Sequence, residues 1–214
     1  MYINIHCHTQ QPRHVFTLMQ YESGYAYPFT QNYSIGLHPW HVNSQWQNAW
    51  EQYLPLLNNK HIWAVGECGL DALCKTPIEI QTEAFRVQIE TACKLQLPLI
   101  IHCVKSFDKV LGILKDYPKV HAAFHGFNKN VSLAQQITKR GYYLSFGEAL
   151  AHPRNQETLK HINLKQVLLE TDYATIQIEK VYTLAAQTLA MQLDRLQEQI
   201  FDNFEHFFSK KLIL

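Results

Sequence analysis

Short β-prone runs that alternate with helical segments constrain this chain more than any other feature of its sequence. Eight such runs recur along the 214 residues. Because parallel strands need long crossover connections, which are usually helices, the alternation predicts an α/β protein with a parallel sheet. Eight strands favour a (β/α)8 barrel of the TIM type. The predicted strands cover residues 2–7, 14–19, 32–37, 61–67, 97–103, 119–125, 142–147 and 166–171.

Helical segments follow most of the later strands. Residues 76–95 carry the clearest signal, with Thr76 as N-cap, Pro77 at the first helical position and Glu79 completing a capping box. Further helices are predicted within residues 106–118, 130–141 and 193–208.

The early connections are too short or too irregular for helices. About six residues separate the first two predicted strands, and residues 21–31 show no helical period. The barrel is therefore predicted to be trimmed, with its early outer helices missing.

Composition indicates one globular domain over residues 1–214. Hydrophobic residues make up 47% of the chain and charged residues 17%, with no linker-like or membrane-spanning stretch and no secretory signal. The five cysteines form no CxxC pair, which favours a reducing compartment. We therefore expect a cytoplasmic protein without membrane association or an obligate protein partner. A net charge of +1 does not by itself indicate a nucleic-acid binder.

Metal-competent side chains stand at the C-terminal ends of five predicted strands. In a TIM-type barrel these ends form the rim that carries the active site. The residues are His6 and His8 at the end of strand one, Glu67 at the end of strand four, His102 at the end of strand five, His125 at the end of strand six and Asp172 after strand eight.

A metal centre explains this set of side chains better than stability does. The alternation of a strand places His6 and His8 on one face and Cys7 on the other, although an HxH pair alone does not distinguish a metal site from an ordinary strand face. Buried charges are costly unless a cation neutralises them. Four imidazoles and two carboxylates suit two divalent ions with a bridging carboxylate, which activate water for hydrolysis. Mixed nitrogen and oxygen ligands leave Zn, Mn, Mg, Fe and Co possible.

The same segments resemble the TatD family of metal-dependent deoxyribonucleases, within the amidohydrolase-like barrel superfamily. The matching segments are "NIHCH", "SIGLHPW", "AVGECGLD", "LPLIIHC", "FHGF", "YYLSFG" and "LLETD", which span residues 4–172. "GECGLD" together with "LLETD" is much more specific than any HxH pair.

The resemblance implies a role for each of the six residues. His6, His8 and Asp172 would bind one metal, His102 and His125 the second, and Glu67 would bridge them. Asp172 would also orient or deprotonate the attacking water, so Glu67 and Asp172 are the implied catalytic residues. The implied activity is removal of nucleotides from DNA ends, and some relatives hydrolyse other esters, including aminoacyl-tRNA.

The chain departs from the family mainly where substrate would bind. Asn4 stands where the family usually has Asp, and Lys105 follows Val104 where an Arg often follows "HC". The usual proline-containing loop after "LLETDYA" is absent. The predicted substrate contacts are His38, in "GLHPWH", with Lys105 and Lys129 near the rim.

The sequence thus predicts a metal-dependent hydrolase, foremost a phosphodiesterase that acts on DNA or another phosphodiester. One alternative is hydrolysis of a carboxylic ester or amide, as in a small metabolite or aminoacyl-tRNA. Another is a non-catalytic, metal-stabilised binding module, which the trimmed loops suggest and the complete ligand set opposes.

Overall fold

Eight strands form one sheet in the order β1 to β8, the strand order of a (β/α)8 barrel, in a computed structural model that describes residues 1–22 and 31–209. Every predicted strand is present, and the predicted TIM-type fold is confirmed. The strands are β1 (Tyr2–Cys7), β2 (Val15–Gln20), β3 (Asn32–Ile35), β4 (Ile62–Asp71), β5 (Leu99–Val104), β6 (Ala122–Phe124), β7 (Tyr143–Phe146) and β8 (Val167–Leu169).

Seven α-helices occur within the described residues, and short 3-10 turns accompany them. The helices are α1 (Trp46–Tyr53), α2 (Ile78–Leu95), α3 (Phe107–Leu114), α4 (Val131–Thr138), α5 (Pro153–Lys160), α6 (Ile178–Thr188) and α7 (Leu193–Phe208). None of the helices in residues 1–22 and 31–209 has both the length and the apolar character needed to cross a bilayer.

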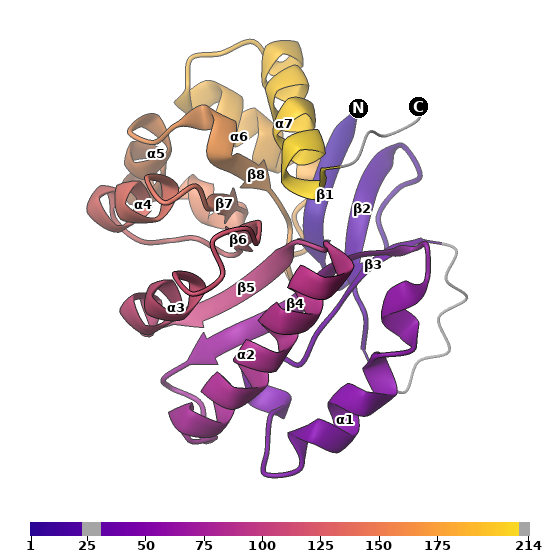
Figure 1. The fold of residues 1–214 in the computed structure, drawn as a ribbon. Coiled ribbons are helices and arrows are strands. Elements are labelled where there is room, and N and C mark those ends of the chain that lie inside the picture. Colours follow the sequence, from indigo (N-terminus) through magenta and orange to yellow (C-terminus); the bar gives the residue numbers. More distant parts are fainter. Residues whose placement is uncertain (23–30, 210–214) are drawn as a thin grey trace. The chain divides into compact units, whose positions relative to one another are not determined.

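Contacts divide the chain into two compact units, and the single domain predicted for residues 1–214 stays a prediction. Unit 1 consists of residues 1–19 and 123–214, and unit 2 of residues 20–122. In unit 1, β1 pairs with β2, and β6, β7 and β8 pair in turn, all in parallel. Helices α6 and α7 pack against each other and against β1 and β8 (Figure 1). The apolar stripe of α7 is buried as predicted, through Leu196, Ile200, Phe204 and Phe207.

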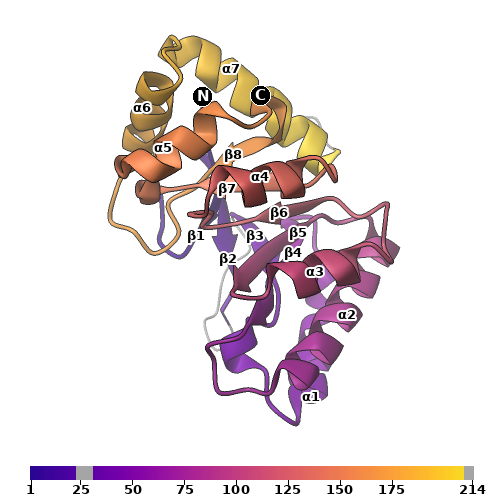
Figure 2. The same cartoon turned by 90° about the vertical axis from the view of Figure 1, so that its left-hand side faces the viewer.

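Unit 2 contains the parallel strands β3, β4 and β5 with helix α2 along β4 (Figure 2). Helix α2 buries Phe85, Ile89 and Ala92, the face that the sequence predicts. At ten residues, β4 is the longest strand, and it ends at Asp71 rather than at Glu67. The four residues of β4 after Glu67 bring a second carboxylate, that of Asp71, to the same end of the strand.

The early connections are as short as predicted. Residues 8–14 between β1 and β2 contain no helix. Most of the segment 21–31, which was also predicted to lack one, lies outside the described residues.

The predicted capping box at the start of α2 is wrong. The helix begins at Ile78, with Pro77 as its N-cap and no side-chain cap bond. The hydroxyl of Thr76 instead donates to the carbonyl of Val42, 2.7 Å away. A partner distant in sequence has therefore taken the group that a local pattern assigns to the helix end.

Candidate metal centre

In unit 1, the end of β1 and the segment after β8 bring two imidazoles to one carboxylate. The Nε2 atoms of His6 and His8 lie 3.6 and 3.5 Å from Oδ1 of Asp172. The backbone holds this approach, because Asp172 N–H donates to the His6 carbonyl and His8 N–H to the Asp172 carbonyl. Cys7 between them is fully buried, as the alternation predicts, and burial raises the pKa of its thiol to about 12.

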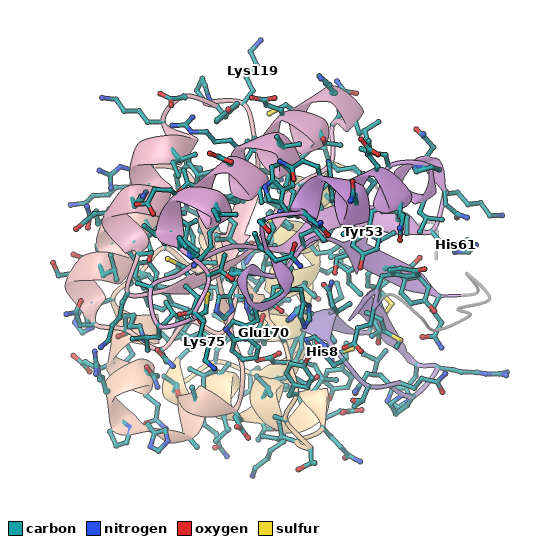
Figure 3. The ribbon with its side chains drawn as sticks, turned by 90° about the horizontal axis from the view of Figure 1, so that it is seen from below. His8, Tyr53, His61, Lys75, Lys119 and Glu170 are labelled. Carbon is teal, nitrogen blue, oxygen red and sulfur yellow. The ribbon has the colours of Figure 1, made fainter. Side chains whose placement is uncertain are left out.

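A second carboxylate, Glu170, lies in the same unit and is almost fully buried. Its Oε1 atom accepts the Gly126 N–H and lies 3.6 Å from Nδ1 of His125. The rings of His125 and His6 are 4.5 Å apart, so three imidazoles share this part of the unit. Figure 3 labels Glu170 together with His8. Glu170 thus lies beside His125, one of the predicted metal ligands.

Asn4 fixes the segment that carries Asp172. Its side-chain amide donates to Oγ1 of Thr171 at 2.8 Å, and its carbonyl oxygen accepts the Thr171 N–H at 3.1 Å. Both residues are buried. Asn4 thus makes two hydrogen bonds to Thr171, one as donor and one as acceptor.

In unit 2, Glu67 collects two imidazoles on one oxygen. Nδ1 of His102 lies 2.7 Å and Nε2 of His38 lies 3.1 Å from Oε1 of Glu67. Nδ1 of His38 accepts the Trp40 N–H, which leaves the Nε2 proton of a neutral ring for Glu67. Burial lowers the pKa of His38 more than its hydrogen bond to Glu67 raises it. Gln20 Oε1 fixes the Glu67 backbone by accepting its N–H.

Asp71 holds the other side of the His102 ring. Its Oδ2 atom lies 3.4 Å from Nε2 of His102 and accepts the indole N–H of Trp40 at 2.7 Å. Burial would raise the pKa of Asp71, but the hydrogen bonds from Trp40, Leu73 and His102 together lower it. Gly69, with φ of 140°, lets its strand approach the backbone of His102 closely, since a Cβ there would lie 2.1 Å from the His102 carbonyl oxygen.

Each unit therefore presents a compact set of ligand atoms suited to a divalent cation. One atom from each of His6, His125 and Asp172 lies within 4.8 Å of the others, and the same holds for His38, Glu67 and His102. Neutral imidazole nitrogens with carboxylate oxygens are the donors that transition-metal ions and zinc prefer. The donor chemistry thus fits the cations that the sequence predicts.

The two predicted lysines differ in their surroundings. Lys105 follows β5, is exposed and has a φ of 50°. Lys129 is half-buried, and its ammonium donates to the side chain of its neighbour Asn128. Their contact with substrate stays a prediction.

Sequence reasoning missed Asp71, Glu170, Trp40 and Tyr173, and strand alternation holds a signal for the two acids. Asp71 is four residues after Glu67 in one strand, so both side chains share a face. Glu170 stands two residues before Asp172 at the end of β8. No comparable pattern marks the two aromatic residues.

Comparison with known proteins identifies a family model and curated relatives that this chain resembles. The model of the family described as TatD related DNase matches residues 3–209. The 3'-5' ssDNA/RNA exonuclease TatD of Salmonella typhimurium is 32% identical over 148 residues, which are 65% of this chain and 56% of the relative. The enzyme of that name from Citrobacter koseri is 31% identical over 166 residues, 71% of this chain and 63% of the relative. The chain thus spans 56 to 63% of the length of these curated relatives.

A solved structure shares the fold. The TatD homologue YjjV from Escherichia coli superposes with a TM-score of 0.84 at 21% identity, over 98% of both chains. This likeness supports the barrel and leaves the chemistry to the side chains.

Proposed function

The chain belongs to the TatD-related DNase family, and from that membership we propose that it is a metal-dependent hydrolase that cuts phosphodiester bonds in DNA. The observation that carries the proposal is the gathering of imidazole and carboxylate ligand atoms within 4.8 Å in each unit. The exonuclease names of the curated relatives support DNA as the substrate class.

On the family resemblance, we propose that His6, His8 and Asp172 bind one cation, His102 and His125 a second, and Glu67 both. The structure differs from this assignment at one residue, because the ligand atom of His125 lies within 4.8 Å of those of His6 and Asp172 in unit 1. Two divalent cations, when bound, lower the pKa of water and neutralise charge on the phosphate oxygens. The identity of the cation, among Zn, Mn, Mg, Fe and Co, is part of the proposal that metal analysis decides.

The difference in exposure between Asp172 and Glu67 suggests different roles for the two carboxylates. The side chain of Asp172 is 37% exposed, whereas that of Glu67 is 5% exposed. Asp172 can therefore meet water from solvent, orient it and accept its proton, while Glu67 serves as a fixed ligand. His38 helps to hold Glu67 in place as a ligand, since it contacts the same Glu67 oxygen as His102.

The direct test uses isosteric variants of both carboxylates. Purified protein supplied with Mn, Zn or Mg should cut single-stranded DNA, and Glu67→Gln and Asp172→Asn should each reduce the rate to background. Asp108→Asn, an exposed acid in the first turn of α3, serves as the matched control and should cut like the parent. Cleavage that survives both site substitutions would falsify the assignment.

Hydrolysis of a carboxylic ester or amide is the second candidate. It is favoured by Lys105, which stands where an Arg often follows "HC" and offers a phosphate no bidentate contact. A protein that cleaves carboxylic esters in a Glu67-dependent way, but no DNA, would establish this candidate. Metal binding without any cleavage would instead indicate a binding module.

A further inference from the structure

Tyr173 is an exposed aromatic residue directly beside a proposed metal ligand. The residue is 63% exposed. Burial does not explain a ring in this position, because most of its apolar area faces solvent.

The ring of Tyr173 lies flat on the imidazole of His8. The two centroids are 3.5 Å apart and the planes are inclined by 12°. His6 meets the same imidazole edge-on, with a centroid distance of 5.0 Å and an angle of 87°. Tyr173 therefore stacks on His8 while more than half of its surface stays accessible to solvent.

A tight turn fixes the ring in place. The Ala174 N–H donates to the Thr171 carbonyl at 2.9 Å, which makes Asp172 and Tyr173 the two central residues of the turn. Asp172 has φ of 53°, a conformation that costs energy for a residue with a side chain. The paired hydrogen bonds between Asn4 and Thr171 anchor the first residue of this turn. The ring thus has a defined place, as a platform for recognition requires.

We propose that Tyr173 binds substrate by stacking on a nucleobase next to the scissile phosphate of a single-stranded nucleic acid. This inference rests on the proposed phosphodiesterase function. An exposed ring accepts any base, because every base has a π-face, but it requires that the base be unstacked from its neighbours. Stacking would also add affinity for the substrate, because Lys105 and Lys129 cannot bind a phosphate in the bidentate way that an Arg does.

The test compares a single-stranded oligonucleotide with a fully abasic strand of equal length. For the parent protein, removal of the bases should raise KM by roughly 5- to 100-fold, the range expected for loss of one base–aromatic stack. Tyr173→Ala should raise KM for the natural strand by a similar factor and leave the abasic strand nearly unchanged. Tyr173→Phe keeps the ring and should behave like the parent.

Metal content and a matched control separate stacking from support of His8. The control Tyr117→Ala removes a tyrosine in the segment before β6, whose hydroxyl donates to Glu90. It should change the KM of neither the natural nor the abasic strand. If Tyr173→Ala lowers metal content and affects both strands equally, the ring acts only through His8 and the inference is overturned. A parent protein that cuts both strands with equal KM also overturns it, with the proposed function intact. A parent protein that cuts neither strand removes the proposed function itself.

Discussion

Glu170 is a buried carboxylate, 1% exposed, whose near neighbours are a backbone amide and an imidazole. A carboxylate beside a metal-binding histidine orients the ring and makes its nitrogen a stronger ligand. In unit 2, Asp71 stands in the same relation to His102. Each unit therefore pairs a proposed histidine ligand with a supporting acid.

The substitution Glu170→Gln should weaken metal binding by roughly 10- to 100-fold, as is typical when an outer partner of a ligand is removed. The isosteric amide can still accept the Gly126 N–H, so the fold should persist. Calorimetric titration of the metal-free protein with Mn or Zn measures the effect.

Glu157→Gln is a matched control for this substitution. Glu157 also lies beside a histidine, with Oε1 3.3 Å from Nδ1 of His161, but both side chains are more than half exposed. Its loss should leave metal affinity unchanged. Equal affinities for the parent and Glu170→Gln would show that the acid does not support His125.

Helix α2 contributes two buried glutamines that hold the ends of neighbouring strands. Gln88 accepts the Leu37 N–H at 2.7 Å and donates to the Leu37 carbonyl at 3.3 Å, directly before His38. Gln81, seven residues earlier on the same helical face, does the same for the backbone of Asp71. Helix α2 thus fixes the backbone at Leu37, next to His38, and at Asp71, beside His102.

Replacing Gln88 by Leu should lower the free energy of unfolding by about 1–3 kcal/mol for each buried backbone group left unpaired. Denaturant titration monitored by circular dichroism measures the loss. Glu83→Leu, at an exposed position of the same helix, introduces the same residue and should change stability little. A stable Gln88→Leu protein would mean that water replaces the lost hydrogen bonds.

Local patterns predicted α2, α3, α4 and α7, whereas α1, α5 and α6 were not predicted. The stripe of α7 was predictable because five of its buried residues are Leu, Ile or Phe. Helix α5 went unnoticed because it buries Asn155 and Thr158 beside Leu159, so its buried face carries no apolar period. The start of α2 was misplaced for a related reason, since Thr76 bonds to a residue 34 positions away.

At the scale of the whole molecule, the predicted fold class led to the predicted ligand set, because the C-terminal ends of barrel strands share one rim. Within each unit, one atom from each of three candidate residues lies within 4.8 Å of the others, and their role as metal ligands stays a prediction. The supporting contacts could not be predicted in this way, because Asp71 and Glu170 act through residues that are distant in sequence. Their roles depend on strand register, which the composition of a single strand does not specify.

Metal should stabilise the folded protein, because the unfolded chain offers no assembled site. A ligand at about 100 times its Kd adds about 2.7 kcal/mol, which for a chain of this size raises Tm by about 5 to 10 °C. Thermal unfolding with added Mn or Zn, and after chelation, measures the shift, and titration should yield two ions per chain. The shift should shrink in Glu67→Gln, and its absence in the parent would argue against any assembled metal centre.

The division of the chain into units has a consequence for biosynthesis. Unit 2 is one continuous segment, whereas β1 and most of β2 are separated from the rest of unit 1 by residues 20–122. His6 and His8 are therefore synthesised well before Asp172, the acid that they contact. Until the segment after residue 122 has been made, β2 is the only partner of β1 within unit 1, while His38, Glu67 and His102 are already present in one continuous segment.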